Sequence, residues 1–194
     1  MRTSAPPLLP IFRSDVQGRL LALIFARPAE EQTVSDLARR LDAHVSTVHR
    51  EVDRLSQAGI LQTRLLGRTR LVRAGSDSPY VPELAALVLK AFGPVPLLRQ
   101  LVARIGGVDE AYVFGSWAER YHGVTGPVPG DIDVLLVGRP DREVVHATAA
   151  EAGRIAGIAV DIVIRSPETW NAGEEGLIRS IRAGHLVPLH GESP

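Results

Sequence analysis

Apolar residues in the first part of the chain recur at the three- and four-residue spacing that predicts amphipathic helices. A first helix is expected over residues 14–26, with Ser14 as its N-cap. A second, shorter helix is expected over residues 33–41, where Thr33 and Asp36 stand close to a capping box. The buried stripe expected for the first helix is Val16, Leu20, Leu21, Leu23 and Ile24.

A third helix and a hairpin follow directly. Residues 45–57 place apolar side chains along one helical face, and Gly59 suits the left-handed residue that follows a helix. The segments 60–65 and 70–73 then read as strands joined through residues 66–69. The expected buried stripe of the third helix is Val45, Val48, Val52 and Leu55.

The rest of the chain alternates apolar strands with helices. Residues 111–114, 132–137 and 158–164 are runs of β-branched and apolar residues, which is typical of buried strands. Helices are expected over residues 83–92, 94–105, 141–156 and 174–183, with a helical turn from Ser166 and an extended segment over 184–190. The pattern predicts an α+β protein.

Composition and charge divide the chain into parts. The first 75 residues hold 12 arginines against 7 acidic residues, a net charge of +5, and the remainder has a net charge of −5. A basic front half suits a polyanion, whereas an acidic rear half suits metal ions. The expected organisation is a Pro-rich tail over 1–13, a domain over 14–75, a linker and connecting helix over 76–93, and a domain over 94–194.

The absence of cysteine excludes a disulfide framework and a thiolate metal site. The apolar run over residues 20–26 is too short to span a bilayer. A cytoplasmic protein without a membrane partner is therefore expected.

The front domain resembles the winged helix-turn-helix of ArsR- and MarR-type regulators. The resemblance covers about residues 14–75, and the segment 46–60 looks like the recognition helix and its exit turn. It implies binding to double-stranded DNA, with the hairpin as the wing. A homodimer on a palindromic site is expected from the same likeness.

On the recognition helix, Thr47 and Arg50 are the candidates for base contacts, and Ser46 and His49 lie near phosphates. Wing arginines would meet the DNA backbone. They are Arg64, Arg68, Arg70 and Arg73. The alternative interpretation is that these side chains form a solvated face.

Three aspartates point to chemistry in the rear domain. Side chains alternate along a strand, so Asp131 and Asp133 share one face, about 6–7 Å apart. Asp161 interrupts another apolar strand, where a lone carboxylate is costly unless something binds it. Carboxylate oxygens suit Mg²⁺. The alternative is that Asp131 and Asp133 are solvated charges at a strand end.

A strand that runs into Gly115-Ser116 and a helix start is a phosphate-holding arrangement. Together with Asp131, Asp133 and Asp161, this pair resembles the signature of the DNA polymerase β-type nucleotidyltransferases, over roughly residues 95–190. The likeness implies that Gly115 and Ser116 hold the triphosphate of an NTP and that the aspartates bind two Mg²⁺ ions. One departure is the fourteen residues between Ser116 and Asp131, more than is common in the family.

These resemblances imply a DNA-binding regulator joined to a small mixed-sheet nucleotidyltransferase domain that transfers NMP to an acceptor hydroxyl. The acceptor stays open among a small molecule, a tRNA end, a protein hydroxyl and no acceptor at all. Two alternatives also stay open. The rear domain is a catalytically silent nucleotide sensor, or it is a protein-interaction module. The aspartate trio argues against the last, because without a cation three carboxylates repel one another.

Overall fold

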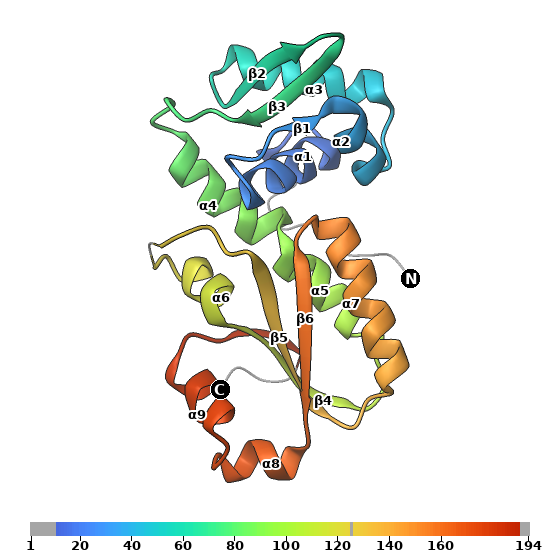
Figure 1. Cartoon of the computed structure of the whole chain (residues 1–194), viewed down its shortest axis with the longest axis vertical. Helices are drawn as coiled ribbons and strands as arrows, with labels where there is room; N and C mark the ends of the chain where they lie inside the picture. Colours follow the sequence, from blue (N-terminus) through green and yellow to red (C-terminus); the bar gives the residue numbers. More distant parts are fainter. Residues whose placement is uncertain (1–10, 125, 191–194) are drawn as a thin grey trace. The chain divides into compact units, whose positions relative to one another are not determined.

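The computed structural model describes residues 11–124 and 126–190, so most of the expected N-terminal tail lies outside it (Figure 1). The chain is an α+β protein that divides into two compact units, residues 1–93 and 94–194. The first unit contains α1 (Asp15–Ala26), β1 (Gln32–Thr33), α2 (Val34–Leu41), α3 (Val45–Gln57), β2 (Leu61–Leu66), β3 (Thr69–Ala74) and α4 (Val81–Phe92). The second contains α5 (Pro94–Val102), β4 (Val108–Phe114), α6 (Gly115–Tyr121), β5 (Asp131–Gly138), α7 (Arg142–Ala156), β6 (Ala159–Arg165), α8 (Pro167–Ala172), α9 (Gly176–Ala183) and β7 (Val187–His190).

Helix α1 is the centre of the first unit. Ser14 caps it as expected, because its hydroxyl accepts a hydrogen bond from the backbone N–H of Gln17 at 3.2 Å. Every residue over 20–26 is buried, since α1 contacts α2, α3 and α4 and so has neighbours on several sides. A helix that is apolar all round is one that the fold encloses.

The three strands of the first unit form an antiparallel sheet in the order β1-β3-β2. Strands β2 and β3 make the expected hairpin, in which Leu66 pairs with Thr69 across a two-residue turn. Gly67 opens that turn with φ +61°, a conformation that glycine adopts without steric cost.

The predicted stripe of α3 is correct except at its first position. Val48 and Val52 are fully buried, and Leu55 is nearly so. Val45, however, is 46% exposed, because it is the first residue of the helix and directly follows the turn after α2. The prediction that Val45 is buried was therefore wrong.

The second unit contains a four-stranded mixed sheet in the order β6-β5-β4-β7. Strands β5 and β6 are parallel and are joined through α7, whereas the other neighbours are antiparallel. One face of the sheet packs on α8 and α9, where Leu135 and Val137 join a cluster with Trp170 and Ile178. Helices α5 and α7, which contact each other, cover the opposite face (Figure 1).

One stretch, Val81–Val102, is long and apolar enough by length and composition alone to cross a membrane. This is weak evidence, because core helices of soluble proteins pass the same test. Gly93 divides the stretch into α4 and α5. Val88 on α4 and Leu98 on α5 are each fully buried.

Candidate functional site

Strand pairing brings two of the three predicted aspartates together. In the parallel ladder of β5 and β6, Asp133 is directly opposite Asp161, and Asp131 is opposite Ala159. Because side chains alternate along a strand, all three carboxylates belong to the same face of the sheet. Residues that are 28 positions or more apart in the sequence thus meet at one end of two neighbouring strands.

On its other side, β5 pairs with β4, and Asp133 is opposite Phe114. The chain leaves β4 at Gly115, whose φ of +69° is strained for any residue with a side chain. A Cβ atom at Gly115 would also lie 2.7 Å from the Oδ2 atom of Asp133, closer than real Cβ contacts. The backbone of the Gly115-Ser116 turn therefore passes directly beside Asp133, and both turn residues are exposed.

The environment of Asp133 disfavours its negative charge. Partial burial raises the pKa of Asp133, and the negative charges of Asp131 and Asp161 raise it further. Among residues 11–124 and 126–190, no Lys, Arg or His forms an ion pair with these three carboxylates. A cation bound there would remove the repulsion.

The donor set has the right chemistry for a hard divalent cation, since carboxylate oxygens are the ligands that Mg²⁺ takes. The side chains do not, however, form a closed cage. Within the described residues, no group of three or more His, Cys, Asp or Glu side chains is arranged to hold a metal ion. The two Mg²⁺ ions and the NTP therefore stay predictions.

The segment between Ser116 and Asp131 is anchored by an ion pair that the sequence did not indicate. His185, which precedes β7, binds Glu119 on α6, with 2.7 Å between Nδ1 and Oε2. His122 stacks on His185 with ring centroids 4.8 Å apart. Hydrogen bonds from the backbone N–H and the side chain of His185 lower the pKa of Glu119. Because 66 residues separate the two partners, no local pattern could have found the pair.

The predicted DNA-contacting residues of α3 lie on its first turns. Ser46 and Arg50 are exposed, whereas Thr47 and His49 are partly buried. No hydrogen bond or ion pair holds the Arg50 side chain within the described part of the chain. The guanidinium group is thus available to a ligand.

The wing arginines differ from one another in their partners. Arg64 binds both carboxylate oxygens of Glu31, with its Nε atom 2.6 Å from Oε1. Arg70 forms an ion pair with Asp53 of α3 and so ties the hairpin to that helix. Arg68 lies exposed in the two-residue turn, and within the described ranges it has no ion-pair partner.

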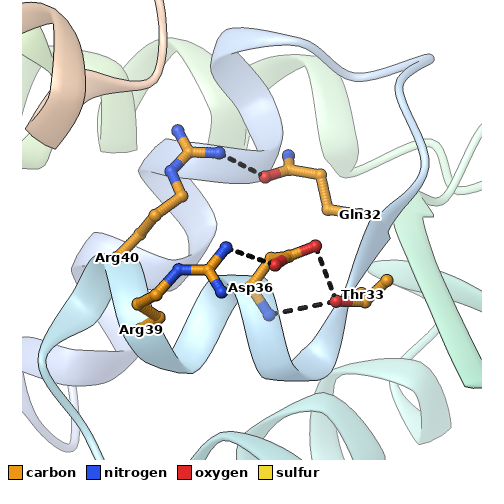
Figure 2. Close-up of polar contacts among 5 residues, drawn as sticks. All are labelled: Gln32, Thr33, Asp36, Arg39 and Arg40. Atoms are coloured by element: carbon orange, nitrogen blue, oxygen red, sulfur yellow. Dashed lines mark hydrogen bonds and ion pairs between the residues drawn. The ribbon is translucent and has the colours of Figure 1, made fainter.

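A polar cluster fixes the start of α2 (Figure 2). The hydroxyl of Thr33 accepts a hydrogen bond from the backbone N–H of Asp36 at 3.0 Å, which confirms the predicted N-cap. Asp36 in turn binds Arg39, and Arg40 donates to the buried Gln32 of β1 at 2.7 Å. Hydrogen bonds from Thr33 and Arg39 lower the pKa of Asp36. These contacts hold α2 against β1 before α3 begins.

The profile of a protein family described as HVO_A0114 matches residues 14–77. That description names neither an activity nor a ligand, and the match covers about a third of the chain. A comparison with curated proteins found no match.

Proposed function

We propose that the protein is a DNA-binding regulator whose first unit is a winged helix-turn-helix and whose second unit is a nucleotidyltransferase domain. The first unit would bind double-stranded DNA, and the second would transfer NMP from an NTP to an acceptor hydroxyl with release of pyrophosphate. A cytoplasmic homodimer on a palindromic site agrees with this proposal.

The DNA-binding half is supported by the order of its elements and by its free charges. Helices α2 and α3 are followed by a β-hairpin, the order expected for a recognition helix and wing. Arg50 on α3 and Arg68 at the hairpin turn both lie exposed, in a chain segment with a net charge of +5. We infer that Arg50 contacts a base edge and that Arg68 contacts a phosphate.

The nucleotidyltransferase half is supported by one observation above all. Asp133 and Asp161 occupy paired positions on neighbouring strands, and the Gly115-Ser116 turn lies against Asp133. Carboxylates that repel one another and have no basic side chain as a partner favour the binding of a metal cation. The exposed residues Gly115 and Ser116 begin α6, whose N-terminus has no side-chain cap, and uncapped helical N–H groups suit an anion.

In this mechanism each residue has a separate task. Asp131 and Asp133, together with Asp161, would hold the Mg²⁺ ions, and the bound ions would supply positive charge that neutralises the triphosphate. Gly115 and Ser116 would grip the phosphates through backbone N–H groups and the Ser116 hydroxyl. Asp161 would orient the acceptor hydroxyl and accept its proton.

The test is incubation of the protein with each labelled NTP, Mg²⁺ and a cell extract. Transfer predicts a labelled acceptor and release of pyrophosphate, both lost when EDTA removes Mg²⁺. The identity of the labelled product would then assign the acceptor as small molecule, RNA or protein. If no NTP binds in the presence of Mg²⁺, the proposal for the second unit is wrong.

A second candidate is that the rear unit is a catalytically silent nucleotide sensor. It is favoured by the absence of a closed three-ligand metal group within the described residues. The two candidates differ in turnover. A sensor would bind an NTP and change the affinity of the protein for DNA, yet leave the NTP intact in the same incubation.

A further inference from the structure

The two edge strands of the second unit's sheet, β7 and β6, differ in how well they are protected from pairing with a further strand. Strand β7 has only four residues, includes Pro188, and its Pro188 carbonyl accepts a hydrogen bond from Arg99 Nε at 3.0 Å. Proline and an attached charged side chain both discourage a further strand from pairing there. Strand β6 has seven residues and contains no proline, and no strand of the described chain pairs with its outer edge. Of the two edges, β6 is the one suited to pairing.

The outer strand also borders a hollow that both apolar and charged residues line. Ile162, Val163 and Ile164 of β6 are only partly buried. Together with α7, they line an open hollow of about 750 Å³. On the helix side this hollow is bordered by the small residues Ala149 and Gly153 and also by Arg142, His146 and Arg154. Partly exposed β-branched residues on an unpaired edge favour pairing with another strand.

The sequence of β6 is complementary to itself in one register. If two copies pair antiparallel about a two-fold axis through Val163, Asp161 of each copy is opposite Arg165 of the other, and Ile162 is opposite Ile164. Shifting the axis to Asp161 places two like charges together, and shifting it to Ile162 leaves Asp161 opposite Val163. Glu175 already pairs with the Arg165 guanidinium through two hydrogen bonds, at 2.8 and 2.7 Å. The register is therefore favoured mainly because it aligns Ile162 with Ile164 and keeps the two Asp161 carboxylates apart, and less by a new ion pair.

We propose that β6 is a homodimer interface in which two copies of this chain pair through this edge, centred on Val163. The result is a continuous eight-stranded sheet with four strands from each copy. Because this two-fold axis is perpendicular to the sheet, Ile162 and Ile164 of both copies share the α7 side and fill the hollow. The interface follows from β6 alone and does not require that the rear unit transfers nucleotides.

The arrangement has a consequence for the acidic corners. Asp161 and its symmetry mate lie on the same face of the joined sheet, four residues apart along the strand direction, which corresponds to about 14 Å. Both candidate sites therefore open on one side of the dimer.

The experiment uses the full chain, which has no cysteine, so an introduced thiol is unique. In V163C the two thiols face each other across the axis, where directly opposite Cβ atoms are about 4.5–5.5 Å apart. Mild oxidation or a short bis-maleimide should convert most of this variant into a covalent dimer. The control is V144C on α7, which is 45% exposed and does not border the hollow. It should cross-link only at the background rate.

A second measurement is the mass in solution by sedimentation or light scattering. The unmodified chain should have about twice its 20.9 kDa monomer mass at micromolar concentration. V163K, which places two ammonium groups on the axis, should shift the dimer toward monomer by at least tenfold in dissociation constant, whereas V144K should not. A monomeric unmodified chain, a dimer that V163K leaves intact, or equal cross-linking of V163C and V144C would each overturn the proposal.

Discussion

The two units treat their charges in opposite ways. In the first unit, several basic residues around the hairpin and α2 are matched with an acidic partner, as in the pairs Arg64–Glu31, Arg70–Asp53 and Arg39–Asp36. In the second unit, Asp131, Asp133 and Asp161 gather at one end of two strands, and in the described residues no cation pairs with them.

The difference indicates where ligands are expected. A charge that the protein already neutralises has a structural role, whereas a charge left without a counter-charge is available to a ligand. By this criterion, Arg50 and Arg68 are more available to the proposed DNA ligand than Arg64 or Arg70. The second unit presents its carboxylates to a cation.

The largest expected effect comes from removing the uncompensated negative charges. D131N together with D133N should weaken Mg²⁺-dependent NTP binding by at least about 100-fold, roughly 2.7 kcal/mol, because the amides no longer neutralise a divalent cation. Titration with a fluorescent NTP, with and without Mg²⁺, measures this loss. D109N changes an exposed aspartate of β4 away from the trio and should bind normally. Unchanged binding by the double variant would remove the basis for a nucleotide site here.

The next effect concerns the free arginine of α3. R50A should weaken binding to the specific DNA site by about 1–3 kcal/mol and relax the preference at one base pair. Selection of bound sequences from a random DNA pool gives the site, and titration gives the affinity. R19A, which removes an arginine paired with Asp15 on α1, is the control and should retain the preference. Loss of affinity without any change in preference would make Arg50 a phosphate contact.

A smaller and different effect is expected at the wing. R68A should weaken binding to all DNA sequences alike and lower the slope of log K against log salt concentration by about 1, because one phosphate contact is lost. Titrations at several salt concentrations measure both quantities. R64A should change the slope less, since Glu31 already neutralises Arg64. If the two variants behave alike, the distinction between paired and free arginines fails.

The smallest effect is on stability. D133N should raise the melting temperature of the Mg²⁺-free protein by a few degrees at pH 7, because it removes a charge that partial burial disfavours and that Asp131 and Asp161 repel. The pKa of Asp133 is raised in the folded state, so its ionisation destabilises the fold as the pH rises above the unfolded value. The gain should therefore shrink as the pH falls and Asp133 becomes protonated. Thermal unfolding of D133N and of the unmodified protein at pH 7 and at pH 4 measures this difference in melting temperature. A gain that persists at pH 4 would mean that repulsion is not its cause.

Local chemistry in the sequence predicted helix ends well. Ser14, Thr33 and Ser166 are N-caps as expected, and each side chain accepts a hydrogen bond from the backbone N–H three residues later. Gly59 has the positive φ predicted for it, +72°. These features depend on contacts within a few residues, which a sequence pattern records directly.

Features that depend on distant partners escaped prediction. Strand β1 is two residues long, and only its pairing with β3, about 40 positions away, makes it a strand. Strand β7 contains Pro188, and its pairing with β4 is likewise remote in sequence. The partners of Arg64 and Arg70 are 33 and 17 residues away, so spacing alone could not separate paired from free arginines. The cost of a lone carboxylate in an apolar strand, together with the family likeness, suggested that Asp161 lies beside Asp131 and Asp133. The register that pairs Asp161 with Asp133 was not predicted.

Gly115 is the position of the candidate site at which we expect the least tolerance of substitution. Its left-handed backbone is one that residues with a side chain rarely adopt, and a methyl group there would also force the Asp133 carboxylate, 2.7 Å away, to move. In a library that samples all twenty amino acids at every position, survivors at 115 should be glycine alone, whereas Gly130, which has open space around it, should admit many replacements. The same constraint acts on natural variation, so related proteins that keep the three aspartates are expected to keep this glycine as well.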